Sequence, residues 1–386
     1  MKILTVLTYY RPHTSGLTIY AERLAHAFAK RGHQVTVMTT QYDPSLKNEE
    51  TIDGVRVIRV PVVARISKGV LAPTFGWVAT KLVAQHDVVQ LHLPQFDAPG
   101  VALRGRLFGK PTVLTYHCDI QLPHGVFNRL VNTVVDFQNN MAGILANHIV
   151  TYTQDYADNS PYLSHYASKL TPILPPVELP TPLPGAVQAF AEAHHVKERK
   201  PVIGMATRFA SEKGVEVLLG ALPTILKKYP KAQVLYAGQH QNVMGEQAYF
   251  DRLAPQIREY EVSGHWTFLG NLDPVQMAAY YPSLDVLTVP SLNSTEAFGL
   301  VQIEAMMNGV PSVPSALPGV RQPVLMHGTG KVSRIGDSAS LAEAILGVLD
   351  EPGKYRADVA SLKRSYDPDT VAKAYEDLFD RLKKRK

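Results

Sequence analysis

Two short stretches in the second half of the chain carry charged side chains at spacings that suit an anionic ligand. Arg208 and Lys213 stand five residues apart in TRFASEKG, directly after an apolar run. A planar guanidinium and a compact ammonium in one loop can converge on a single group such as a diphosphate. Glu296 and Glu304 add two carboxylates eight residues apart in TEAFGLVQIEAM, a little over two helical turns.

A strand, a loop and a helix are expected around the two glutamates, in that order. The apolar run Val286–Val289 predicts a buried strand, and Phe298–Met307 carries apolar residues at helical spacing before Asn308 and Gly309. This order places the helix N-terminus at the carboxyl edge of a parallel sheet, where open α/β sheets bind ligands. We therefore expect free backbone N–H donors at the start of the helix, from Ala297, Phe298, Gly299 and Leu300.

Both stretches also have a purely structural interpretation. Arg208 and Lys213 could belong to a solvated charged turn. Glu296 could serve only as a partner of the helix dipole, with Glu304 at a solvated helix position. The residues taken alone leave these alternatives open.

The rest of the second half alternates between predicted strands and predicted helices. Gly238 ends one predicted strand, and the turn Gly270-Asn271-Leu272 follows the next. Strands are predicted at 201–206, 233–237 and 266–269, and helices at 277–281, 338–350 and 353–364. The last helix is predicted from Asp367, a residue type favoured at the N-cap and followed by Pro368, to Lys383.

The first half shows the same alternation, which predicts a mostly parallel, doubly wound sheet. Strands are predicted at 3–7, 34–40, 55–60, 88–91, 112–115 and 148–153, with helices at 17–30, 98–108 and 126–146. Gly16 lies at the first strand-to-helix turn, where a phosphate or sugar can approach the backbone, although such a glycine is usually only part of a turn. His117 follows a strand in the loop YHCD, where a histidine is usually structural or solvated.

Composition places the chain among globular proteins of two or three domains. It has 386 residues, of which 45% are hydrophobic and 19% are charged. The stretch PILPPVELPTPLP at 172–184 holds six prolines. Because proline breaks helices, we interpret this stretch as a semi-rigid linker between domains.

Charge and cysteine content narrow the setting and the partners. The net charge of +5 permits a basic surface that faces phosphates or anionic lipid without requiring one, and we expect no nucleic-acid partner. The single cysteine, Cys118, excludes an intrachain disulfide and fits a cytoplasmic protein. MKILTVLTYY predicts a strand rather than a signal peptide, and no run reaches the ~18 apolar residues of a membrane span.

The two charged stretches together resemble the signatures of a known enzyme family. Glu-Ala-Phe-Gly-Leu followed by a second Glu, and Arg, four residues and Lys-Gly after a strand, are similar to motifs of retaining nucleotide-sugar glycosyltransferases. That family includes the sucrose-phosphate synthases and the phosphatidylinositol mannosyltransferases. The resemblance covers essentially the whole chain and is strongest over 201–315. One difference is that Gly16 stands alone where the family commonly has two adjacent glycines.

The resemblance implies two facing Rossmann-like domains of the GT-B type with an interdomain cleft. Residues 1–180 would form the acceptor-side domain, and 181–365 the domain that holds the donor. The helix at 366–386 would cross back to the first domain, with a position on the second domain as the alternative.

The resemblance also implies a role for each candidate residue in binding a UDP- or GDP-linked sugar. Arg208 and Lys213 would neutralise the diphosphate, and Glu304 would bind the ribose. Glu296, with the amides of 297–300, would hold the sugar hydroxyls. His117 would contact the donor sugar, and Gly16, Gly238 and Leu272 would lie beside the donor. The reaction would retain the anomeric configuration, without cofactor or metal, since the one Asp-x-Asp (367–369) opens a helix instead of following a strand.

Two other functions remain open for this architecture. A nucleotide-sugar epimerase would convert the donor into an isomer without any acceptor. A non-catalytic hinge-type sugar-binding protein would bind free sugars without nucleotide, although an Arg–Lys loop suits a diphosphate better than a neutral sugar.

The acceptor is expected on the first domain, as a lipid, a glycan or a small molecule. The stretch RISKGVLAPTFGWVATK at 65–81 mixes Arg65, Lys68 and Lys81 with large apolar residues, and a second basic group surrounds Leu107 and Phe108. Basic and apolar side chains together can seat a protein on an anionic membrane, which would make the enzyme peripheral at the inner face. The alternative is an ordinary amphipathic helix whose apolar face joins the core.

Overall fold

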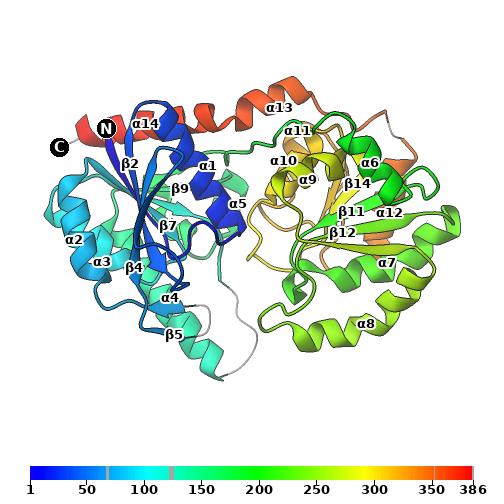
Figure 1. Cartoon of the computed structure of the whole chain (residues 1–386), viewed down its shortest axis with the longest axis horizontal. Helices are drawn as coiled ribbons and strands as arrows, with labels where there is room; N and C mark the ends of the chain where they lie inside the picture. Colours follow the sequence, from blue (N-terminus) through cyan, green and yellow to red (C-terminus); the bar gives the residue numbers. More distant parts are fainter. Residues whose placement is uncertain (67–68, 121–125, 352, 385–386) are drawn as a thin grey trace. The chain divides into compact units, whose positions relative to one another are not determined.

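The computed structural model describes residues 1–66, 69–120, 126–351 and 353–384, and the chain divides into two compact units (Figure 1). Unit 1 consists of Met1–Val177 together with Ser365–Lys386, and unit 2 is Glu178–Arg364. The first boundary therefore falls inside the proline-rich stretch at 172–184. The first residue of that stretch, Pro172, does not belong to a linker, because it is the last residue of an edge strand, β10 (Leu170–Pro172).

A doubly wound sheet forms the centre of unit 1, as the alternating pattern predicts. Its strand order is β10-β9-β8-β7-β1-β2-β4-β3, and neighbouring strands are parallel except for the edge pair β3–β4. The bounds are β1 Lys2–Val6, β2 Gln34–Gln41, β3 Glu49–Ile52, β4 Val55–Pro61, β7 Val88–Leu93, β8 Thr112–Tyr116 and β9 His148–Thr151. A separate hairpin pairs β5 (Ala64–Ile66) with β6 (Gly69–Leu71).

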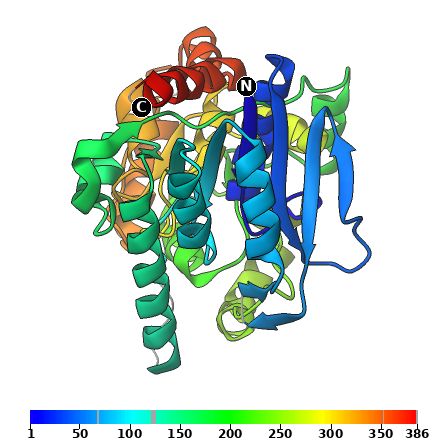
Figure 2. The same cartoon turned by 90° about the vertical axis from the view of Figure 1, so that its left-hand side faces the viewer.

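Helices cover the sheet of unit 1, and the last helix of the chain is one of them. The helices are α1 Gly16–Lys30, α2 Phe75–Gln85, α3 Ala98–Leu107, α4 Val126–Leu145, α5 Gln154–Asn159 and α14 Pro368–Lys384. In Figures 1 and 2, α14 (red) runs along the part of unit 1 where the N-terminus also lies. The carboxylate of Asp367 accepts a hydrogen bond from the N–H of Asp369 at 2.7 Å, so Asp367 caps α14 as the sequence indicates.

Ion pairs and buried hydroxyls join α14 to the first helix and the sheet of unit 1. Arg31, the C-cap residue of α1, donates from Nε to Oε1 of Glu376 at 2.6 Å and from Nη1 to Asp369 at 2.8 Å. The hydroxyl of Tyr375 lies 2.8 Å from that of Tyr20 and 2.9 Å from Oγ1 of Thr115. Tyr375 is fully buried, so α14 contributes to the core of unit 1.

Unit 2 is a smaller parallel sheet with the strand order β13-β12-β11-β14-β15. Its strands are β11 Val202–Ala206, β12 Gln233–Ala237, β13 Trp266–Gly270, β14 Val286–Val289 and β15 Ser312–Pro314. Its helices are α6 Ala186–Ala193, α7 Val215–Lys228, α8 Gln247–Val262, α9 Pro274–Tyr280, α10 Leu300–Met306, α11 Gln322–His327 and α12 Ser338–Leu349, and α13 (Val359–Tyr366) leads back into unit 1.

The order of strands in unit 2 creates a switch point beside β11. The chain proceeds from β11 to β12 on one side and later returns to β14 on the other side. Loops that leave adjacent parallel strands in opposite directions open a crevice at their carboxyl ends. The loops 207–214 after β11 and 290–299 after β14 border this point, and they carry both charged stretches.

Two predicted helices begin later than the sequence suggests. The helix expected from Phe298 begins at Leu300, because Gly299 takes a left-handed conformation (φ 78°) directly before it. The helix expected at 353–364 is α13, which begins at Val359. Along the described ranges, no helix is both long and apolar enough to cross a membrane.

Candidate active site

Lys213 and Glu296 bring the two charged stretches of unit 2 together. The ammonium Nζ of Lys213 lies 2.8 Å from Oε2 of Glu296, and both side chains are largely buried. Lys213 ends the short helical turn Ser211–Lys213, and Glu296 lies in the turn before α10. The pair therefore crosses the switch point from the loop after β11 to the loop after β14.

The backbone holds these two loops against each other. Gly214 adopts a left-handed conformation (φ 69°), and a Cβ atom there would lie only 2.1 Å from the carbonyl oxygen of Pro290. The N–H of Leu292 donates to the carbonyl of Glu212 at 2.8 Å. Glycine after Lys213 is thus required by close approach of the second loop, which explains the Lys-Gly pair at this position.

Arg208 lies in the same loop as Lys213 but is more exposed. Its guanidinium Nη2 forms an ion pair with Oε1 of Glu212, and 41% of the Arg208 side chain remains accessible. Arg208 and Lys213 are thus each paired with a different carboxylate. An anionic ligand at this edge would meet two cations whose present partners it can replace.

Glu304 lies deeper than Glu296 and has a different neighbour. It is on α10, only 8% exposed, and its Oε2 accepts a hydrogen bond of 2.7 Å from the hydroxyl of Tyr281. The two glutamates thus occupy different environments, one ion-paired at the loop and one buried beneath it. A solvated helix position, the structural alternative for Glu304, does not describe its surroundings.

The residues between the two glutamates form the start of α10. Ala297 and Phe298 are buried, Gly299 caps the helix, and Leu300 is its first residue. The side-chain amide of Gln302 donates to the carbonyl of Phe298 at 2.9 Å and to that of Val320 at 2.8 Å. Gln302 therefore holds the backbone of this turn in place through two side-chain hydrogen bonds, a role that the sequence does not reveal.

Gly238 and Leu272 lie at the neighbouring strand ends of the same unit. Gly238 follows β12 with φ 137°, and a Cβ there would lie 2.0 Å from the carbonyl oxygen of Thr207. Its N–H donates to the carbonyl of Gly270 at 2.7 Å, which ties it to the turn that holds Leu272. These contacts hold the loops after β11, β12 and β13 together along one edge of the sheet.

A stacked pair of rings adjoins this turn, and the sequence analysis does not include it. The imidazole of His240 lies parallel to the ring of Phe268, with centroids 4.1 Å apart and an interplanar angle of 8°. Phe268 belongs to β13, two positions before Gly270. A histidine in a polar loop gives no sequence signal for such a contact, because its partner is on another strand.

Gly16 and His117 belong to unit 1, so each is described within that unit. Gly16 is the first residue of α1, and the side chain of Ser15 caps the helix by accepting from the N–H of Thr18 at 3.2 Å. A Cβ at Gly16 would meet no atom within 4 Å. The space beside Gly16 is therefore open within unit 1, and a Cβ atom would fit there.

His117 is buried in a row of hydrogen-bonded rings at the carboxyl end of the sheet. Its Nε2 lies 2.8 Å from Nδ1 of His92, and its Nδ1 contacts the hydroxyl of Tyr152. Burial and the neighbouring His92 hold the pKa of His117 well below its usual range, and burial lowers the pKa of His92 to about 3. Both ring nitrogens of His117 are thus engaged inside unit 1, and the contact to a donor sugar stays a prediction.

The described site provides charge and hydrogen-bond acceptors, and it offers no cluster suited to a metal. Across residues 1–66, 69–120, 126–351 and 353–384, no group of three or more His, Cys, Asp or Glu side chains could hold a metal ion. Arg208 and Lys213 supply two cations, and Glu296 and Glu304 supply two carboxylates. This combination suits a ligand with a phosphate part and a hydroxyl-bearing part.

Two family models match the chain, one in each unit. The model described as "Glycosyl transferase 4-like domain" matches residues 15–160, and the model described as "Glycosyl transferases group 1" matches residues 187–365. Both charged stretches and every candidate residue of unit 2 lie within the second match.

Relatives in sequence and in structure agree with these matches. The chain is 24% identical to a phosphatidyl-myo-inositol mannosyltransferase of Mycolicibacterium smegmatis, over 91% of this chain and 85% of the relative. It is 27% identical to a glycogen synthase of Mycobacterium tuberculosis, over 98% and 94%. The structure of Anabaena HepE in complex with UDP-glucose superposes with a TM-score of 0.77 at 20% identity, covering 99% of this chain and 100% of the other. The likeness to such structures confirms the expected GT-B fold class.

Proposed function

We propose that this glycosyltransferase, matched by a group 1 model over residues 187–365 and by a 4-like model over residues 15–160, transfers a sugar from a nucleoside-diphosphate donor to an acceptor hydroxyl. The observation that carries this proposal is the meeting of Lys213 and Glu296 across the switch point of unit 2. It places a cation for a diphosphate beside a carboxylate for sugar hydroxyls. HepE, a structural neighbour, has been solved with UDP-glucose, which supports a UDP- or GDP-linked sugar as the donor.

In the proposed site, donor binding exchanges the partners of the charged residues. The diphosphate competes with Glu296 for Lys213 and with Glu212 for Arg208. Glu296 is then free to accept hydrogen bonds from the sugar hydroxyls, and the backbone N–H groups of residues 297–300 donate to sugar oxygens. Glu304, already oriented by Tyr281, accepts a hydrogen bond from the ribose.

The proposed reaction retains the configuration at the anomeric carbon. The acceptor oxygen forms a bond to that carbon from the face on which the diphosphate leaves, and the bond to the diphosphate oxygen breaks. A phosphate oxygen of the donor takes the acceptor's proton. Arg208 and Lys213 stabilise the negative charge that develops on the diphosphate, so the proposal includes neither a metal ion nor a cofactor.

Unit 1 is the proposed site of the acceptor, and its surface favours a lipid-linked one. Trp77 on α2 and Leu107 on α3 are 73% and 74% exposed, although α2 buries Phe75 and Leu82 in the core. Exposed Lys81 and Arg106 lie on the same two helices. An amphipathic helix that only packs on the core, the alternative stated above, therefore explains one face of α2 and not the other. We propose peripheral contact with an anionic membrane as the setting for the reaction. Lys68, which the sequence analysis includes in this surface, lies outside the described residues.

A thermal-shift panel of nucleoside diphosphates, nucleotide sugars and free sugars tests the proposal. A ligand that binds only the folded chain stabilises it by about 2.7 kcal/mol at a hundredfold excess over its Kd. We expect a rise in Tm with one nucleoside diphosphate and its sugar conjugate. A rise with free sugars alone would identify a sugar-binding protein instead, and conversion of the donor to an isomer without acceptor would identify an epimerase.

A further inference from the structure

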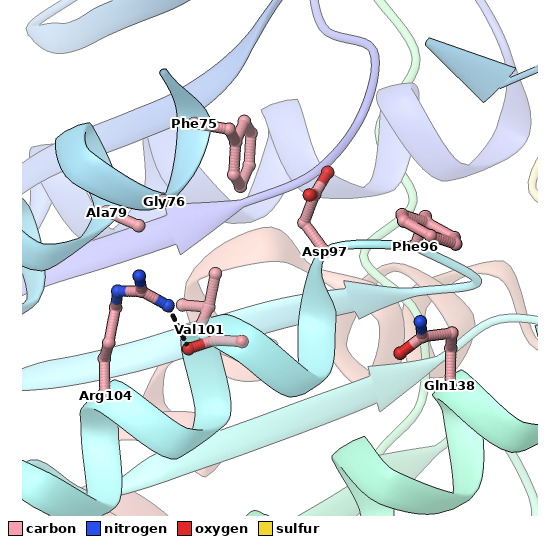
Figure 3. A pocket seen from close by; sticks show the side chains of 9 residues that line it. Phe75, Gly76, Ala79, Phe96, Asp97, Val101, Arg104 and Gln138 are labelled. Atoms are coloured by element: carbon pink, nitrogen blue, oxygen red, sulfur yellow. Dashed lines mark hydrogen bonds between the residues drawn. The ribbon is translucent and has the colours of Figure 1, made fainter. Parts of the chain in front are cut away.

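Unit 1 contains a cavity of about 210 Å³ that none of the candidate donor residues lines (Figure 3). It lies between α2, α3 and α4, next to the loop that joins β7 to α3. The residues that matter for its chemistry are Phe75, Phe96, Asp97, Val101, Arg104 and Gln138. Because all of them belong to unit 1, the cavity is complete within that unit.

Three polar groups on the wall of the cavity have hydrogen-bonding capacity to spare. Among the described residues, the carboxylate of Asp97 has no hydrogen-bond or ion-pair partner, although burial raises its pKa. Arg104 uses Nε on the hydroxyl of Thr80 at 2.7 Å and Nη1 on the carbonyl of Gly100 at 2.8 Å, which leaves Nη2 for a ligand. The side-chain amide of Gln138, reaching in from α4, likewise has no partner within the described part of the chain.

Two aromatic rings provide the apolar part of the cavity. Phe75 is buried and forms part of its floor, whereas Phe96 is 59% exposed at its rim. An exposed phenylalanine ring offers a face with negative electrostatic potential, which attracts the C–H groups of a saturated ring. The cavity thus combines ring faces with a carboxylate, a guanidinium and an amide.

This combination selects among the possible ligands. A hydrocarbon chain would cover the Asp97 carboxylate and the Gln138 amide without giving them partners, which is costly. An anion would face one negative carboxylate and one positive guanidinium. Because these two charges cancel, the net charge of the cavity wall would not favour the anion. A neutral polyol satisfies all three polar groups and can lay its C–H face on Phe96.

We propose that this cavity binds one pyranose ring of the acceptor, which makes the acceptor a glycan or a glycosylated lipid. Its volume lies below the ~300 Å³ of sites for drug-sized ligands, so a single ring fits it better than a longer saccharide. Asp97 accepts hydroxyl protons, while Arg104 and Gln138 donate to ring or hydroxyl oxygens. The identification of the ring as part of the acceptor rests on the proposed function, whereas the sugar site itself does not.

Saturation-transfer NMR with the methyl glycosides of glucose, mannose and galactose tests the site on the full chain. Phe96→Ala removes an exposed ring with little risk to folding, and Asp97→Asn keeps the shape while removing the charged acceptor. Phe137→Ala, at a phenylalanine that is 62% exposed and does not line the cavity, is the matched control. We expect at least one glycoside to bind, with affinity reduced roughly tenfold in the first two variants and unchanged in the control.

The readouts separate this proposal from the proposed function. The thermal shift with the nucleoside diphosphate should be the same in all three variants, because unit 2 is unchanged. Absence of glycoside binding, or equal binding by Phe96→Ala and wild type, would overturn the sugar site even if the nucleotide binds. Glycoside binding that is lost in Phe96→Ala, in a chain that binds no nucleotide, would uphold the sugar site and overturn the proposed transferase.

Discussion

Lys213 and Glu296 stand 83 positions apart in the sequence, and their charged groups lie 2.8 Å apart in the structure. Each belongs to one of the two stretches that the sequence singles out for its chemistry. Their pairing keeps both charges compensated while no diphosphate is bound, since an unpaired and largely buried charge would be costly. It also makes each residue's contribution to donor binding depend on the other.

Replacing Lys213 by Ala should lower the transfer rate about a hundredfold. Loss of one charged contact that strengthens in the transition state costs roughly 3 kcal/mol. Arg208→Ala should act in the same direction, and steady-state kinetics on folded protein would measure both. Lys200 is a suitable control, because it forms an exposed pair with Asp285 in the same unit. Near-normal rates in both variants, or an equal loss in Lys200→Ala, would rule out the assigned roles.

The two glutamates should differ in their effect on nucleotide binding. Glu304→Gln should weaken binding of the free nucleoside diphosphate, because every nucleotide presents the ribose. Glu296→Gln should spare or slightly strengthen that binding, since Lys213 loses its competing partner, while transfer is impaired. Calorimetry with the product nucleotide would measure both. Equal losses of affinity would contradict the division of roles between the two carboxylates.

Tyr281→Phe offers a finer test of the buried glutamate. It removes the hydroxyl that donates to Glu304 and leaves the carboxylate in place. We expect a loss of nucleotide affinity of about 1 kcal/mol, smaller than in Glu304→Gln. The loss is smaller because the Glu304 carboxylate remains as an acceptor and only the hydroxyl that orients it is removed. An affinity equal to that of wild type would show that Tyr281 does not position Glu304 for the ribose.

Unit 1 should lose stability as the pH falls below about 6.5. Burial depresses the pKa of His92 to about 3 and that of His117 well below its usual range, so the unfolded chain binds protons that the folded unit does not. Stability therefore falls with decreasing pH, by roughly 1.4 kcal/mol per pH unit for each histidine. Urea denaturation at pH 7 and pH 5 would measure the slope. His92→Gln should reduce this slope, and an unchanged slope in His92→Gln would contradict the account.

Flotation with liposomes tests the membrane setting. Binding to anionic vesicles at low salt should weaken as salt is added and in the variant Lys81→Glu/Arg106→Glu, because screening and charge reversal both remove attraction to the lipid. Lys228→Glu/Lys363→Glu, with two basic residues changed in unit 2, is the matched control. Failure to bind at low salt would rule out a membrane-associated acceptor and leave a soluble glycan.

The sequence predicts most of the architecture because its periodic patterns are local. The strands at 233–237 and 286–289 have the predicted bounds, since each is a buried apolar run closed by a turn residue. The edge strand β3 is missed because its residues alternate between exposed and half-buried positions without an apolar run. The late start of α10 is missed because the left-handed Gly299 cannot be inferred from its neighbours.

The candidate site is predicted in its residue types and missed in its contacts. The sequence singles out Arg208, Lys213, Glu296 and Glu304 because loops after parallel strands gather at one edge, and their roles stay predictions. That Lys213 pairs with Glu296 depends on how two distant loops approach, whereas the pairing of Arg208 with Glu212 depends on side-chain orientation within one loop. Tyr281 escapes notice for a similar reason, since its partner Glu304 lies 23 positions away, and Gln302 joins the nearby Phe298 to the more distant Val320.

The chain passes between the units twice, at residues 177–178 and 364–365, so unit 2 is an insertion into unit 1. A fragment comprising 178–364 would keep the internal contacts of unit 2. A fragment ending at 177 would lack α14, leaving the hydroxyl of Tyr20 and the guanidinium of Arg31 without their partners. A premature stop codon in the final helix would therefore damage the fold of the N-terminal half, the part of the protein encoded furthest from it.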